Sequence, residues 1–177
     1  MWQNSGVVLD ARLKKLAKGL SARDAADAFV ASQTDPLSLR DSERAQAAEF
    51  EATIEAMFLM AAVDGEITPA ELGQLTASIE AIMDVAGKRV NTDKILADFN
   101  TRLGKDGWKA RLDAVKTNLR TQEARSFAFR LAAGVAFVDD HVAHAEAAAI
   151  TALAAALELS AEESQDILED VQETLFG

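Results

Sequence analysis

The chain contains no cysteine and no tyrosine, and only two prolines and two histidines among its 177 residues. Without cysteine, disulfide bonds, thiolate metal sites and a cysteine nucleophile are all excluded. No apolar run approaches the roughly 18 residues that a membrane-spanning helix needs. The first residues offer neither a basic region nor an apolar stretch of signal-peptide length, so we expect a cytoplasmic protein.

Basic residues are missing from one long part of the chain, since none follows Arg130. Residues 131–177 carry ten carboxylates, and residues 41–87 carry ten against a single arginine. Between these acidic arms, residues 88–130 hold eleven basic and five acidic residues. We expect this basic middle to pair with both arms. The net charge of −11 argues against a nucleic-acid partner, so other proteins are the expected partners.

The scarcity of proline and the abundance of Ala, Leu, Glu and Asp favour helix throughout. We predict an all-α fold, a helical bundle of about seven core helices with an N-terminal helical extension. A linker around Pro36 separates this extension, residues 1–38, from a core domain at 39–177. Residues 8–20 form a basic amphipathic segment. Docking onto the domain or another subunit is its expected role, and peripheral membrane contact is the alternative.

Capping residues predict where several helices begin. Asn91, Asp106, Thr121 and Ser160 are the predicted N-caps of four helices. The alanine-rich helix after His141 is expected to be central, because small side chains let helix axes approach closely. Apolar spacing predicts the core positions Phe50, Ile54, Met57, Phe58, Leu72, Leu75, Ile79, Ile82, Ile95, Phe99, Leu103, Leu112, Val115, Phe127, Leu131, Val135, Ile167 and Val171.

One acidic stretch occurs twice, 75 residues apart and without gaps. In each copy an apolar helix leads into an aspartate, a short polar loop follows, and a glutamate stands seven residues after the aspartate. The first copy spans residues 62–71 and the second spans residues 137–146. We therefore predict an internal repeat of two helix-loop-helix units.

The aspartate of each copy is a candidate metal ligand. Asp64 follows the end of a helix, where the helix dipole disfavours an anion, so a nearby positive charge is expected. Either the N-terminus of the next helix or a bound cation would supply this charge. Thr68 and Glu71 have the spacing of a capping box, which accounts for Glu71 without a metal. In the second copy the capping threonine is lost, yet Glu146 is retained.

Both histidines of the chain, His141 and His144, fall in the second copy beside its carboxylates. Imidazole with carboxylate suits Mn, Zn, Fe or Ni, whereas the all-carboxylate first loop suits Ca or Mg. One shared site and two separate sites are both compatible with the pattern. The candidate ligands for a divalent metal ion are Asp64, Glu66, Glu71, Asp139, Asp140, His141 and Glu146.

The two copies resemble the TerB-like tellurite resistance family of bacterial all-helical domains. The first copy, Asp64-Gly65-Glu66-Ile67-Thr68-Pro69-Ala70-Glu71, follows the family's pattern. The second matches at Asp139 and Glu146 but has Asp140-His141 where Gly-Glu is usual. The resemblance covers about residues 41–175. It implies a helical bundle with paired acidic loops, a divalent-metal site, and a link to stress or tellurite resistance.

The residue spacing of this chain does not match the known catalytic and metal-binding motifs that we compared with it. An EF-hand needs a glutamate eleven residues after its first acidic ligand, and di-iron bundles need Glu-x-x-His. No His-Glu-x-x-His, phosphate-binding glycine loop or serine-nucleophile signature is present, so no catalytic residue is predicted. We therefore expect a metal-binding sensor or adaptor. The alternative is a metal-free protein-interaction module, and a metal-dependent hydrolase is the third class.

Overall fold

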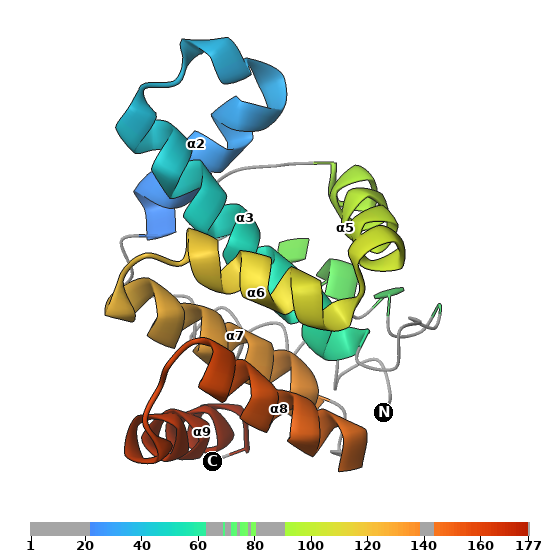
Figure 1. Ribbon diagram of the computed structural model, residues 1–177, viewed down its shortest axis with the longest axis vertical. Coiled ribbons are helices and arrows are strands. Elements are labelled where there is room, and N and C mark those ends of the chain that lie inside the picture. The colour runs from blue at the N-terminus through green and yellow to red at the C-terminus, as the bar shows by residue number, and fades with distance from the viewer. Residues whose placement is uncertain are drawn as a thin grey trace.

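The structure, a computed structural model, describes residues 22–62, 91–138 and 144–176, together with part of the segment from Pro69 to Glu80. The described residues contain helices and no strand, which confirms the predicted all-α class (Figure 1). The helices are α2 (Ala22–Thr34), the 3-10 helix η1 (Pro36–Ser38), α3 (Asp41–Ala61), α5 (Thr92–Asp106), α6 (Trp108–Asn118), α7 (Gln122–Val138), α8 (His144–Ala156) and α9 (Ala161–Phe176). None of the helices in this part of the chain is both long and apolar enough to cross a membrane.

Helix α3 is the central element of the bundle. Every residue from Ala52 to Met60 is buried, so this half of the helix is enclosed on all sides. Helices α2, α6 and α7 pack against it, and Figure 1 shows it crossing the middle of the molecule. Phe58 contacts Phe99 of α5, with ring centroids 5.8 Å apart. The predicted core positions of this helix are confirmed, since Phe50, Ile54, Met57 and Phe58 are all buried.

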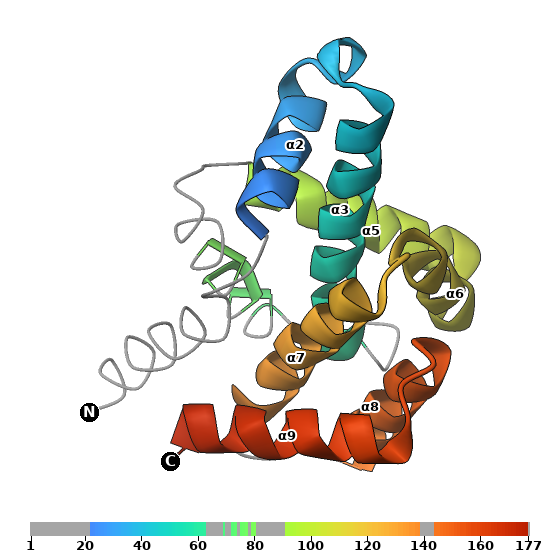
Figure 2. The same ribbon diagram turned by 90° about the vertical axis from the view of Figure 1, so that its left-hand side faces the viewer.

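Helices α2 and α3 form a hairpin that is joined by the predicted proline linker. Pro36 begins the short helix η1, and Leu39 after it is buried. Phe29 of α2 lies against Phe50 of α3, with ring centroids 5.4 Å apart. Figure 2 shows this hairpin at one end of the molecule and α8 and α9 at the other. The domain boundary at residue 38 stays a prediction, while Phe29 makes α2 part of the common apolar core.

The corner between α5 and α6 combines one confirmed cap with one correction. The Asn91 side chain accepts a hydrogen bond from the Lys94 backbone N–H at 3.2 Å, as predicted. The predicted cap at Asp106 is wrong, because Asp106 is the last residue of α5. Gly107 makes the corner at a φ of 88°, where glycine is favoured. Helix α6 therefore begins at Trp108 without a side-chain cap.

Helices α7 and α9 begin at the predicted caps. The Thr121 hydroxyl accepts from the Ala124 N–H at 3.1 Å, and the Ser160 hydroxyl accepts from the Glu163 N–H at 3.0 Å. The predicted apolar face of α7 is confirmed at Leu131, which is buried, and in part at Phe127 and Val135, which pack against the core. The buried residues of α7 are Ala128, Phe129, Leu131, Ala132, Ala133, Gly134 and Ala136, whereas Phe127 and Val135 are half-buried.

Two further predictions about the core are corrected. Helix α8 is not central, because Ala148, Thr151 and Ala155 are exposed and one of its faces meets solvent. Small side chains permit close packing but supply little apolar area, so the larger side chains of α3 define the centre. Leu72 is 38% exposed and does not belong to the core, while Leu75 beside it is buried as predicted.

Candidate functional site

Six of the seven predicted metal ligands lie outside the described residues, namely Asp64, Glu66, Glu71, Asp139, Asp140 and His141. The seventh, Glu146, is in the first turn of α8, where the structure describes the course of the helix but not this side chain. His144 is the first residue of the same helix. Among the described residues, no group of three or more His, Asp or Glu side chains could hold a metal ion.

The structure does describe the helices that lead into both acidic loops. Helix α3 ends at Ala61, three residues before Asp64, and α7 ends at Val138, directly before Asp139. These two helices pack against each other, and they are the pair that the internal repeat relates. The repeat itself stays a prediction, because the second helix of the first copy is described only in part.

The end of α3 is attached to α6 by two polar contacts, which we call the α3–α6 clasp. Arg111 binds both carboxylate oxygens of Glu55, with Nε to Oε2 at 2.7 Å and Nη2 to Oε1 at 2.8 Å. One turn further along α3, the Leu59 carbonyl accepts from the Trp108 indole N–H at 2.8 Å. Glu55 and Leu59 are four residues apart and Trp108 and Arg111 three, so each pair shares one helix face. The clasp therefore fixes α6 beside the last turns of α3.

The Glu55 carboxylate is the buried centre of the clasp. Its side chain is 4% exposed and that of Arg111 is 15% exposed. The hydrogen bond from Arg111 to Glu55 raises the pKa of the guanidinium above its ordinary value, so Arg111 stays charged. A buried carboxylate needs such a partner, because an unpaired charge away from water is strongly unfavourable. Since Arg111 binds both of its oxygens, Glu55 is a structural group and not an available general base.

Three more charged residues, Arg102, Glu51 and Asp106, extend the clasp toward the surface. Arg102 of α5 binds Glu51 at 2.6 Å and lies 3.7 Å from the nearer Glu55 oxygen. Its guanidinium is also 5.7 Å from the centre of the Phe99 ring. Asp106, the predicted helix cap, instead binds Arg111 Nη1 at 3.1 Å. The network thus connects α3 with both helices of the α5–α6 corner.

A second ionic cluster joins the turn after α8 to α6 and α7. Lys116 Nζ lies 2.6 Å from one oxygen of Glu158, and Arg125 Nη1 lies 3.5 Å from the other. The hydrogen bond and charge of Lys116, with the charge of Arg125, lower the pKa of the exposed Glu158 carboxyl. Glu158 also has a φ of 59°, a left-handed conformation that few side chains other than Asn adopt without strain.

These ion pairs confirm that the basic middle of the chain pairs with both acidic arms. Arg102 and Arg111 bind carboxylates of α3, whereas Lys116, Arg125 and Arg130 bind carboxylates after residue 131. The sequence predicted this pairing in general, and it indicated that Trp108 faces inward, but it did not identify Glu55, Arg111 or the hydrogen bond of the Trp108 indole. The signal that was available is a lone glutamate within the apolar run of α3.

Comparisons with known proteins identify no relative, because no family model, curated protein or solved structure matches the chain. The resemblance to the TerB-like family therefore rests on the residues of the two acidic loops.

Proposed function

We propose that the protein is a divalent-metal-binding sensor or adaptor module whose ion is held by the acidic loops after α3 and α7. The observation that carries the proposal is the packing of α3 against α7, the two helices that lead into these loops. Asp64 and Asp139 each follow the negative end of a helix dipole. A cation lowers the free energy of a carboxylate in that position.

The chemistry of the donors limits which ions are expected. The first loop offers the carboxylates Asp64, Glu66 and Glu71, a donor set that suits Ca or Mg. The second loop adds His141 to Asp139, which also suits Mn or Zn. The resemblance to the TerB-like family supports a role in stress or tellurite resistance.

Thermal unfolding with and without metal tests the proposal. An ion that binds only the folded protein adds roughly 2.7 kcal/mol of stability at about 100 times its dissociation constant. For a chain of this size the melting temperature should rise by roughly 5–10 °C. We expect such a rise with Ca, Mg, Mn or Zn, relative to the same protein in chelator.

Asparagine variants locate the ion in the acidic loops. Asp64→Asn and Asp139→Asn keep the side-chain shape but remove the charge that a hard cation needs, so each should reduce the metal-induced shift. Glu71→Gln should reduce it less, because glutamine still serves in a capping box. Asp113→Asn is the matched control, since Asp113 is an exposed carboxylate of α6. If none of the four ions shifts the wild-type melt, the metal-free interaction module becomes the better proposal.

A further inference from the structure

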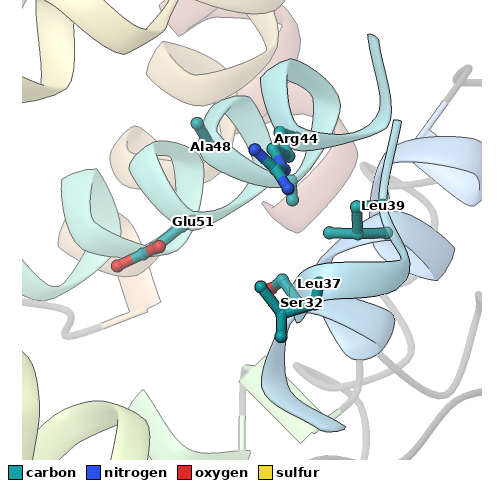
Figure 3. A pocket seen from close by; sticks show the side chains of 7 residues that line it. Ser32, Leu37, Leu39, Arg44, Ala48 and Glu51 are labelled. Carbon is teal, nitrogen blue, oxygen red and sulfur yellow. The ribbon is translucent and has the colours of Figure 1, made fainter. Parts of the chain in front are cut away.

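A groove of about 360 Å³ lies between the linker region and the first half of α3 (Figure 3). Its lining residues are Ser32, Leu37, Leu39, Arg44, Ala47, Ala48 and Glu51. The four residues from α3 follow the spacing i, i+3, i+4 and i+7, so they form one stripe along the helix. Two small alanines form the floor between the longer side chains of Arg44 and Glu51.

The rim of the groove carries an unusually exposed apolar side chain. Leu37 in η1 is 88% exposed, more than any other large apolar side chain among the described residues. Leu39, two residues later, is buried. Pro36 occupies the first turn of η1 and restricts its backbone, so the turn holds Leu37 at the surface. Covering Leu37 would remove apolar surface from water, which favours association.

The two charged residues of the groove differ in whether they are already paired. Glu51 is neutralised by Arg102 at 2.6 Å. Arg44 forms no ion pair with any other residue that the structure describes, and Figure 3 shows its side chain at the groove beside Leu39. The Arg44 end of the groove therefore keeps a positive charge in a chain whose net charge is −11.

We propose that this groove binds a peptide segment of a partner protein in which a bulky apolar side chain lies next to a carboxylate. The apolar side chain would pack between Leu37 and the floor formed by Ala47 and Ala48. The carboxylate would bind the guanidinium of Arg44, whose planar donors match carboxylate geometry. The proposal goes beyond metal binding, since none of these residues belongs to the acidic loops.

Short labelled peptides test this docking surface directly. The probes are fluorescein-labelled peptides on a Gly-Ser background that carry one tryptophan and one glutamate at varied spacing. Fluorescence anisotropy with the full chain is measured in chelator, so that failure of the metal proposal does not affect the result. We expect saturable binding at one or more spacings. Replacing the glutamate of the probe by glutamine should weaken binding about tenfold, because a charge-assisted hydrogen bond is lost.

Variants of two exposed groove residues test the proposed contacts, and a variant outside the groove is the control. Arg44→Glu and Leu37→Asp should each weaken binding at least about tenfold, whereas Arg120→Glu should not. Arg120 is exposed and outside the groove, so it matches the charge change. A probe with lysine in place of glutamate should bind Arg44→Glu better than it binds the wild type, which also shows that this variant is folded. Absence of binding at every spacing, or equal binding to wild type and Arg44→Glu, would overturn the proposal.

Discussion

Glu55 is a charged residue in the middle of the most enclosed stretch of α3. Removing its carboxylate from water costs free energy, and Arg111 offsets this cost with two hydrogen bonds and a full charge. The pair therefore behaves as one unit, and replacing either residue alone should lower the free energy of unfolding.

A double-mutant cycle measures this dependence. Arg111→Met should lower the free energy of unfolding by up to about 3–5 kcal/mol, because the buried Glu55 charge loses both hydrogen bonds and keeps only Arg102, at 3.7 Å, as an ion-pair partner. The double variant Glu55→Leu/Arg111→Met should be far less destabilised, since the site becomes apolar. Urea unfolding at neutral pH gives the values, and Arg120→Met is the exposed control. A double variant as unstable as Arg111→Met would show that packing, and not charge, holds α6 in place.

Glu158 provides a prediction about pH. Its carboxyl pKa is lower in the folded protein than in the unfolded chain, chiefly through Lys116. The ion pairs therefore contribute stability above the unfolded-state pKa, about 4.3 for glutamate, and lose it as pH falls through the folded-state pKa. Wild type should be more stable than Glu158→Gln at neutral pH. Thermal melts across the acid range should show this difference shrinking, and a constant difference would contradict the assignment.

At the scale of helices, the packing of α2 on α3 determines how separable the N-terminal part is. Phe29→Ala should lower the free energy of unfolding by about 3–5 kcal/mol, because it opens a cavity beside Phe50. A chain that lacks residues 1–38 should still be helical and should unfold cooperatively. Its free energy of unfolding should fall by an amount similar to that of Phe29→Ala, and its melting temperature should fall with it. Circular dichroism and urea titration measure the helix content and the cooperativity of the truncated chain. A molten or unfolded product would show that the core domain requires α2 and that the boundary at residue 38 is wrong.

Helix boundaries were predictable where their signals are local. Asn91, Thr121 and Ser160 cap their helices through backbone groups three residues away, so their spacing is visible in the sequence. The buried face of α7 was predicted only in part, because four of its seven buried residues are alanines and one is a glycine, which contribute little to an apolar pattern. The core helices that carry larger side chains, such as α3 and α5, had a pattern strong enough to predict.

The polar sites were less predictable because their partners are distant in the chain. Glu55 and Arg111 are 56 residues apart, and no spacing rule connects them. The groove around Leu37 likewise combines α2, η1, the linker and α3. A sequence motif can indicate the acidic loops, whose residues are contiguous. It cannot indicate which arginine remains unpaired once the helices have packed.

At the scale of the whole molecule, the internal repeat makes a geometric prediction. If residues 54–82 and 129–157 are structural copies, an experimental structure with metal should superpose their helix pairs and relate Asp64 and Asp139 by a pseudo-twofold axis. The mutual packing of α3 and α7 is compatible with this arrangement. Unrelated crossing angles in the two helix pairs would make the sequence match a coincidence.

The contact between Trp108 and Leu59 gives the molecule a built-in optical probe. The chain has only two tryptophans, so Trp2→Phe leaves the indole of Trp108 as the sole long-wavelength emitter. That indole donates to a carbonyl in the last turn of α3, immediately before the first acidic loop. Its emission maximum and quenching therefore report on the ordering of this turn, without an attached dye and in the same cuvette as an ion titration.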